Sequence, residues 1–195
     1  MIQIDEISKV SSALCVCLSI YLYTIDRTFL TIFPCLLIIS AIVMQWRFGL
    51  TETDETIDET EFSNLILYGS LAVMGAFLSA SVTSKLLANQ LLSFNLGHRI
   101  LYGINAAIAE EEFFRGFLTN LLLKWSDGAA GLSIVASSAA FMAYHFSVYG
   151  MQPTSTLLYV MSSGLSLGAS AWKTDRLSTN ILAHAFVNMI AFGVS

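Results

Sequence analysis

Hydrophobic residues divide the chain into long uncharged segments that are separated by short polar ones. A helix rises about 1.5 Å per residue, so roughly 20 apolar residues cross the hydrocarbon core of a bilayer. We therefore predict an all-α fold, a polytopic transmembrane helix bundle with about seven spans and one helix at the membrane interface. The predicted spans are 10–25, 28–46, 62–84, 100–123, two within 128–172, and 177–194, and the interfacial helix covers 85–99.

Glycine and proline refine the positions of these helices. Pro34 lies inside the second span and predicts a kink there. Gly150 and Pro153 interrupt the long uncharged segment and indicate a turn between the fifth and sixth spans. Gly164 and Gly168 form a G-x-x-x-G pattern in the sixth span, which predicts close packing against a neighbouring helix.

The composition supports a membrane protein, and we expect it in a prokaryotic cell membrane. Of 195 residues, 55% are hydrophobic and 12% are charged, whereas soluble domains carry about 25% charged residues. The net charge is −5, and the acidic stretch 52–61 argues against a nucleic-acid partner. Cys15 and Cys17 would point to different faces of one helix, so we interpret them, with Cys35, as buried apolar residues and not as a metal site.

Four charged residues interrupt the fourth span, and we expect them to have a function. They are Glu110, Glu111, Glu112 and Arg115. One charge at the centre of a spanning helix costs about 2.5–3.5 kcal/mol. Glu111 and Arg115 are four residues apart, share a helix face and can pair. Glu110 projects at a different angle and can face a separate cavity.

Other strongly polar residues occur on two of the remaining spans. His145 lies in the fifth span, and His184 and Asn188 share one face of the seventh. Because polar groups inside a membrane turn toward the bundle interior or a wet cavity, we expect them to meet the glutamates. A carboxylate can activate water, an imidazole can orient it, and N–H donors can stabilise an oxyanion. This set suits hydrolysis of an acyl bond by water, and neither G-x-S-x-G nor H-E-x-x-H is present.

Three short motifs occur in order along the second half of the chain. Residues 110–116 carry E-E-x-x-x-R-G, residues 141–145 carry F-x-x-x-H, and residues 184–188 carry H-x-x-x-N. This ordered set resembles the CAAX-protease and bacteriocin-processing family of intramembrane endopeptidases, which includes the type II CAAX prenyl endopeptidases. The resemblance implies a bundle whose last four helices enclose a wet chamber in the membrane.

The resemblance also implies a role for each motif residue. Glu110 would be the base that activates water, and His145 would help to hold that water. His184 and Asn188 would stabilise the oxyanion. The implied organisation is a single transmembrane domain, 1–195, and no cofactor is implied.

Within that domain the resemblance separates two parts. Residues 1–99 hold the N-terminal spans, the acidic linker and the interfacial helix, and 100–195 form the four-helix catalytic core. Glu111 matches the second glutamate of the motif, and Arg115 would brace the cluster. Glu112 occupies a position that is usually apolar in the family, and its role stays open.

Other functions are compatible with these residues. Glu110, His145 and His184 could instead bind a zinc ion with an open position, although the resemblance favours the metal-free form. A non-enzymatic membrane protein for bacteriocin immunity or binding is the main alternative. A proton-coupled transporter is a further one, but the sequence has no inverted repeat. For the enzyme, the expected partners are the lipid bilayer and a membrane-embedded or lipidated substrate, such as a CAAX-like tail, a C-terminal sorting tail or a peptide precursor.

Overall fold

The computed structural model describes residues 1–25, 29–48, 50, 96–149 and 154–193. Within these ranges the regular elements are helices, apart from one isolated bridge between Gln3 and Arg176, so the predicted all-α class is confirmed for the described residues. The elements are α1 (Glu6–Ile25), α2 (Phe29–Phe48), α4 (Leu96–Glu111), η1 (Glu112–Thr119), α5 (Asn120–Trp125), α6 (Ala130–Tyr149), α7 (Thr154–Thr174) and α8 (Leu177–Gly193).

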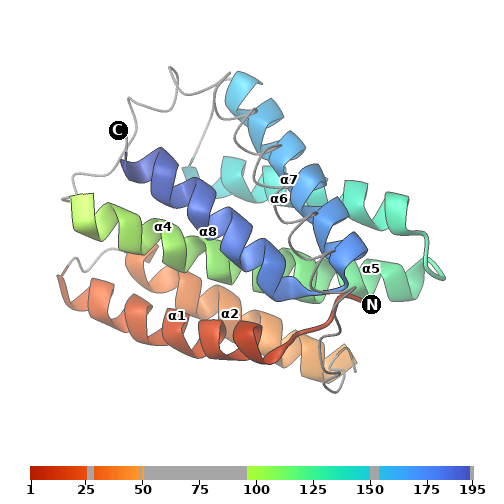
Figure 1. Ribbon diagram of the computed structural model, residues 1–195, viewed down its shortest axis with the longest axis horizontal. Coiled ribbons are helices and arrows are strands. Elements are labelled where there is room, and N and C mark those ends of the chain that lie inside the picture. Colours follow the sequence, from red (N-terminus) through yellow and green to blue (C-terminus); the bar gives the residue numbers. More distant parts are fainter. Residues whose placement is uncertain (26–28, 49, 51–95, 150–153, 194–195) are drawn as a thin grey trace.

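A central rod of three consecutive elements, α4, η1 and α5, runs through the molecule (Figure 1). The junction residues Glu111 and Asn120 both have α-helical backbone angles, so the chain does not turn between the elements. The sequence predicts this segment as one helix, but not that η1 is a π-helix of eight residues. Such segments are rare and frequently lie at functional sites. Here the π-helix begins directly after Glu111.

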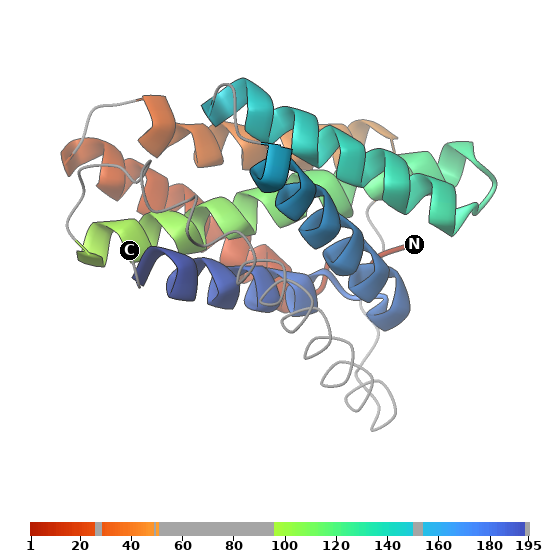
Figure 2. The ribbon, with the colours of Figure 1, turned by 90° about the horizontal axis from the view of Figure 1, so that it is seen from above.

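The other helices pack in pairs around this rod. α1 and α2 contact each other and lie against α4 and η1 on one side. α6 and α7 form a second pair on the other side, and α8 runs beside α4 (Figures 1 and 2). Small, fully buried residues such as Ala107 and Ala109 let these neighbours approach α4 closely. The rod therefore holds its polar side chains between two layers of helices.

The predicted helices are found where residues are described, with shifted ends. α6 ends at Tyr149 and α7 begins at Thr154, as the predicted break at Gly150 and Pro153 requires. α2 continues through Pro34, and the kink there stays a prediction. The predicted third span, and the interfacial helix up to residue 95, lie outside the described residues; residues 96–99 form the first turn of α4 instead.

The number of membrane spans stays a prediction. Among the described residues, α1 has the length and apolar composition to cross a membrane. Three shorter apolar helices accompany it, at Ile32–Phe48, Ala130–Phe146 and Leu177–Ile190. The division of the chain at residue 99 is likewise a prediction that the helix packing does not test.

The predicted close packing at the two glycines of α7 is confirmed. A Cβ atom added at Gly164 would lie 3.1 Å from the Cβ of Ser138, and one at Gly168 would lie 2.8 Å from Cγ2 of Ile134. Both neighbours belong to α6. Because these two positions lack a side chain, α7 lies directly on α6. This packing sets the position of the cavity wall that α7 forms.

Candidate active site

Glu111 is the centre of a buried polar cluster. Its side chain is fully buried, and its Oε1 atom lies 3.1 Å from Nη1 of Arg115. The same oxygen is 2.8 Å from Nδ1 of His184, and Oε2 accepts a hydrogen bond of 3.3 Å from Asn180. The predicted pairing of Glu111 with Arg115 is thus confirmed. The guanidinium of Arg115 balances the charge of the Glu111 carboxylate. The carboxylate can therefore also bind the imidazole of His184 and hold its ring in one orientation.

His184 connects the two neighbouring glutamates. Its Nδ1 atom faces a carboxylate oxygen of Glu111, so this nitrogen carries a proton. Its Nε2 atom then points the other way and lies 3.7 Å from Oε2 of Glu110. Glu110 is only 3% exposed. The expected meeting of Glu110 with a histidine of the last helix is therefore found, with Glu110 and Glu111 at opposite nitrogens of one ring.

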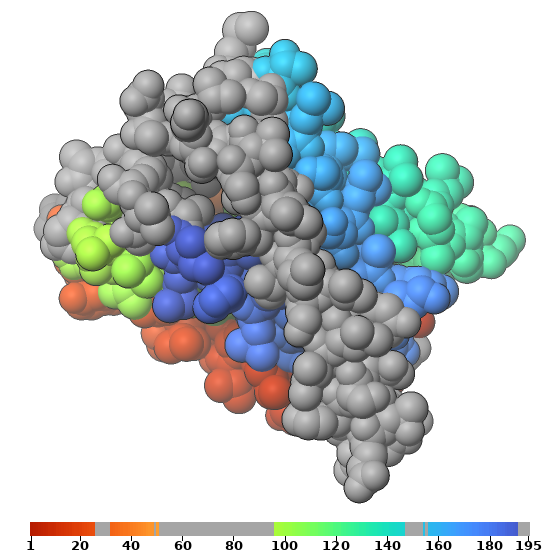
Figure 3. Space-filling model, turned by 45° about the horizontal axis from the view of Figure 1, so that its top comes forward, coloured from red at the N-terminus to blue at the C-terminus, as the bar shows by residue number. Residues whose placement is uncertain are grey.

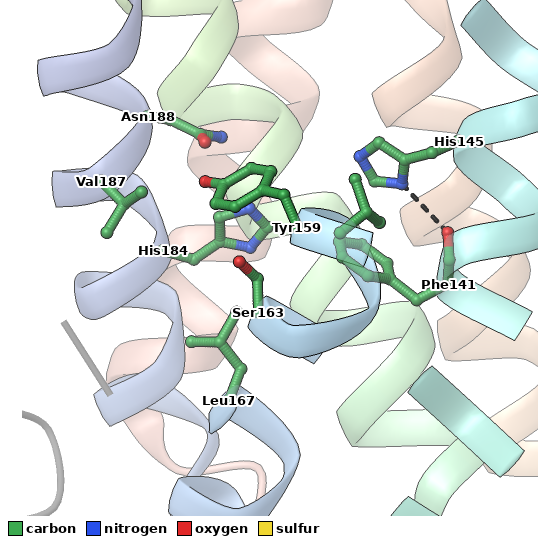
Figure 4. A pocket seen from close by; sticks show the side chains of 9 residues that line it. Phe141, His145, Tyr159, Ser163, Leu167, His184, Val187 and Asn188 are labelled. Carbon is green, nitrogen blue, oxygen red and sulfur yellow. Dashed lines mark hydrogen bonds between the residues drawn. The ribbon is translucent and has the colours of Figure 1, made fainter. Parts of the chain in front are cut away.

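His145 is held by its own helix. Its Nδ1 atom lies 3.0 Å from the carbonyl oxygen of Phe141, which can only accept, so Nδ1 carries the proton and Nε2 of the neutral ring is an acceptor (Figure 4). The Phe141 ring lies 4.4 Å from the His145 ring and 6.0 Å from the His184 ring, centroid to centroid. The guanidinium of Arg115 lies 4.6 Å from the same centroid. The buried ring of Phe141 thus lies next to both histidine rings and packs on the guanidinium of Arg115, which is paired with Glu111.

Arg115 also ties the rod to α7. Its Nη2 atom donates a hydrogen bond of 3.3 Å to the carbonyl oxygen of Gly164. The side chain is 2% exposed, so this contact and the pair with Glu111 take place away from solvent. Arg115 therefore contacts residues of three helices: α4 through Glu111, α6 through Phe141, and α7 through Gly164.

Asn188 lies one turn beyond His184 on α8. Its amide nitrogen donates a hydrogen bond of 2.9 Å to the carbonyl oxygen of Gly103 on α4. An amide nitrogen carries two hydrogens, so one of them stays available for a ligand. The side chain lies at the cavity that His184 also faces.

A cavity of about 60 Å³ lies between α6, α7 and α8 (Figure 4). It is lined by Phe141, His145, Tyr159, Val160, Ser163, Leu167, His184, Val187 and Asn188. One water needs about 10–15 Å³, so the cavity is large enough for more than one. Glu110 does not belong to this lining; it contacts the lining residue His184. In the space-filling view α7 and α8 both reach the surface on the same face (Figure 3).

Glu112 points away from this cavity, toward α1 and α2. Its Oε1 atom accepts a hydrogen bond of 2.8 Å from Ser12, and its Oε2 atom accepts one of 3.4 Å from Gln45. It is 1% exposed. The motif glycine Gly116 serves this packing, because a Cβ atom there would lie 2.9 Å from Nε2 of Gln45 and 3.2 Å from Oε2 of Glu112. Of the three consecutive glutamates, Glu110 and Glu111 contact His184, and Glu112 has a separate environment.

The sequence analysis missed four polar residues near the site. Asn180 binds Glu111, Tyr144 lies near Glu110, and Tyr159 and Ser163 line the cavity. Asn180 could have been found, since it precedes His184 by the four residues that separate His184 from Asn188. The two α7 residues gave no such signal, because hydroxyl side chains are common in helices of this kind.

The arrangement does not form a metal site among the residues that the structure describes. No group of three or more His, Cys, Asp or Glu side chains is placed to hold an ion. Both ring nitrogens of His184 face carboxylates, since Nδ1 lies 2.8 Å from Oε1 of Glu111 and Nε2 lies 3.7 Å from Oε2 of Glu110.

A scan against protein families matches residues 92–190 to the type II CAAX prenyl endopeptidase Rce1-like family. The chain belongs to this family. The matched region extends from before α4 into α8 and contains all three motifs, so the predicted family is confirmed. The family consists of membrane-embedded CAAX-type endopeptidases, and membership indicates a protease. A search of curated proteins found no match, and neither did a search of solved structures.

Proposed function

We propose that this protein is an intramembrane endopeptidase that hydrolyses a peptide bond with a water molecule activated by Glu110. The supporting observation is the position of His184, which lies between Glu110 and Glu111 and lines a cavity together with His145 and Asn188. Two imidazoles and an amide from α6 and α8 thus line one small space, and one carboxylate of α4 lies at each nitrogen of the His184 ring.

In the first step the Glu110 carboxylate takes a proton from a water molecule, whose oxygen attacks the carbonyl carbon of the scissile bond. His145 accepts the second hydrogen of that water at Nε2, which orients the oxygen. This assignment follows from its Nδ1 atom, which already donates to Phe141. A positioned general base of this kind contributes about 10²–10⁴-fold to the rate.

The attack places a negative charge on the former carbonyl oxygen, and His184 and Asn188 would stabilise it. Asn188 uses one amide hydrogen for Gly103 and offers the other. For Nε2 of His184 to donate as well, the ring must carry protons on both nitrogens, since Nδ1 faces Glu111. Loss of one oxyanion donor typically costs about 10²–10³-fold in kcat.

The second step breaks the carbon–nitrogen bond. Glu110 returns its proton to the departing amine, and the oxyanion collapses to a carboxylic acid that loses its proton to solvent. One water is consumed, and one new amino terminus and one new carboxyl terminus form. No covalent bond between enzyme and substrate is required.

Glu111, Arg115 and Asn180 would support this chemistry from outside the cavity. The carboxylate of Glu111 sets the orientation of the His184 ring, and Arg115 balances its charge. Asn180 binds the second oxygen of the same carboxylate. Orientation of a catalytic imidazole by a buried carboxylate is a recurring device in hydrolases.

The substrate would be a membrane-associated or lipidated polypeptide. The family points to a CAAX-like C-terminal tail, and sorting tails and peptide precursors are processed by similar chemistry. Val160, Leu167 and Val187 give the cavity apolar walls between its polar groups, which suits aliphatic side chains next to the scissile bond. No metal or other cofactor takes part in the proposed reaction.

The test is cleavage of a farnesylated peptide with a Cys-aliphatic-aliphatic-Met end by purified protein in lipid nanodiscs. The intact protein should release the C-terminal tripeptide, as detected by mass spectrometry. Glu110→Ala and His145→Ala should each abolish release while the thermal unfolding midpoint stays near that of the parent. Release that survives both changes would refute the proposal, and chelator-sensitive activity with stoichiometric metal would favour the zinc form.

A further inference from the structure

Ser163 has a buried hydroxyl group whose bonding potential is not used. The residue lies on α7, is 7% exposed and lines the cavity of the candidate active site. Among the described residues, its Oγ atom has no hydrogen-bond partner. Buried side-chain hydroxyls are nearly always bonded, since an unmade hydrogen bond costs free energy. An exception that faces a cavity calls for a functional explanation.

Its neighbours on the same helix make the exception clearer. The hydroxyl of Ser162 donates a bond of 2.9 Å to the carbonyl oxygen of Tyr159, and so satisfies itself within the helix. Tyr159, one turn before Ser163, approaches it without the geometry of a hydrogen bond. Ser163 could adopt the same internal bond but instead directs its oxygen toward the space in front of His184 (Figure 4).

A stripe along α7 forms the side of the cavity opposite α8. Tyr159, Ser163 and Leu167 are spaced by four residues, lie on one helix face and all line the cavity. Across from them, α8 contributes His184 and Asn188, the proposed oxyanion donors. A peptide whose scissile carbonyl points at α8 would therefore present its remaining backbone groups to α7.

We propose that Ser163 binds the backbone of the substrate peptide beside the scissile bond through its Oγ atom. This inference rests on the proposed function and adds a binding residue from α7, a helix that carries none of the three motifs. A hydroxyl can donate to a backbone carbonyl or accept from a backbone N–H, so it holds the chain without selecting a side chain. The hydrogen bond that the free protein lacks would be formed in the complex.

Ser163 is not placed to act as a nucleophile. A serine nucleophile needs an adjacent base that takes its proton. His184 uses Nδ1 for Glu111 and turns Nε2 toward Glu110, and His145 donates from Nδ1 to a carbonyl. No hydrogen bond joins Ser163 to either ring in the part of the chain that the structure describes.

The experiment measures binding separately from cleavage. Glu110→Gln protein in nanodiscs is titrated with a fluorescent farnesylated peptide ending in Cys-aliphatic-aliphatic-Met, alone and combined with Ser163→Ala, Ser163→Thr or Ser162→Ala. Loss of one hydrogen bond to the peptide should weaken binding by about 3- to 10-fold in Ser163→Ala. Ser163→Thr, which keeps the hydroxyl, should bind within about twofold of the parent, and so should the control Ser162→Ala.

Two further measurements separate binding from structure and from chemistry. Ser163→Ala removes an unpartnered buried hydroxyl, so its unfolding midpoint should be equal to or above that of the parent. In the active protein the same change should raise KM by the factor seen in the titration, with kcat nearly unchanged.

Equal affinity with and without the Ser163 hydroxyl would overturn the inference while leaving the proposed function intact. So would a loss confined to kcat, which would make Ser163 part of the chemistry. If the peptide binds none of the variants and the parent does not cleave it, the proposed function fails and the inference with it.

Discussion

Replacing Glu111 or Glu112 by glutamine is the same chemical change at two adjacent buried positions, and the structure predicts opposite results. Glu111 is paired with the cation of Arg115 and with His184. Within the described part of the chain, Glu112 accepts hydrogen bonds from the neutral side chains of Ser12 and Gln45. Both carboxylates are at most 1% exposed, so burial does not distinguish them.

The magnitudes follow from these partners. Glu111→Gln leaves the guanidinium of Arg115 buried without an opposite charge, which costs about 3–5 kcal/mol. At about 2–4 °C per kcal/mol for a chain of this size, the unfolding midpoint should fall by roughly 6–20 °C. The change also releases the ring of His184, so kcat should fall by about 100-fold, the scale of a lost oxyanion donor.

Glu112→Gln should be close to neutral. It weakens two hydrogen bonds by about 1 kcal/mol each, because bonds to a charged group are stronger than neutral ones. It also removes the cost of burying a carboxylate without a cation, which is of similar or larger size. We expect a midpoint within about 4 °C of the parent and kcat within about threefold.

The assay is thermal unfolding of both variants in the same detergent, followed by cleavage of the farnesylated peptide. Because the two variants share composition and net charge, each is the control for the other. A larger loss of stability or activity in Glu112→Gln than in Glu111→Gln would refute the assignment of Glu111 as the residue that holds the cluster.

Three other changes test separate parts of the site. Tyr144→Phe removes the hydroxyl that lies near Glu110 but keeps the ring, so kcat should fall by about tenfold with an unchanged unfolding midpoint; a changed midpoint with normal kcat would indicate a packing role. Asn180→Ala removes a donor to the Glu111 carboxylate and should lower the free energy of unfolding by about 1–3 kcal/mol in denaturant titrations, and no loss would contradict that bond. Gly168→Ala places a Cβ atom 2.8 Å from Cγ2 of Ile134 and should cost about 1–3 kcal/mol, whereas a neutral result would show that the helices can separate.

The sequence was sufficient to predict the all-α class, the helices among the described residues and the contact of Glu111 with Arg115. Uncharged segments give helix positions directly, and the charged interruption that begins at Glu110 marks the helix whose carboxylates contact His184. Spacing by four residues predicted two relations, the pairing of Glu111 with Arg115 and the shared face of His184 and Asn188, because a helix turn fixes such neighbours. The family assignment depended on three motifs in order, and the family match confirms it.

Other features depend on contacts between distant segments, which spacing does not encode. The separate environment of Glu112 arises because Ser12 and Gln45 come from two N-terminal helices. The π-helix after Glu111 changes which side chains share a face. It could not be predicted from the sequence, because the prediction assumed regular α-helical spacing. Ser163 became notable only when its missing partner and its cavity were both known.

The central claim is that side chains from separate helices act together on one bond, and a double-variant kinetic cycle tests it most directly. Single-turnover cleavage is measured for the parent, Glu110→Gln, His145→Ala and the combined variant. Residues that act as a unit are strongly non-additive, so the combined variant should be no more than about threefold slower than the slower single variant. Rate losses that multiply in the combined variant would show that Glu110 and His145 act independently, and would contradict the account of a shared active site.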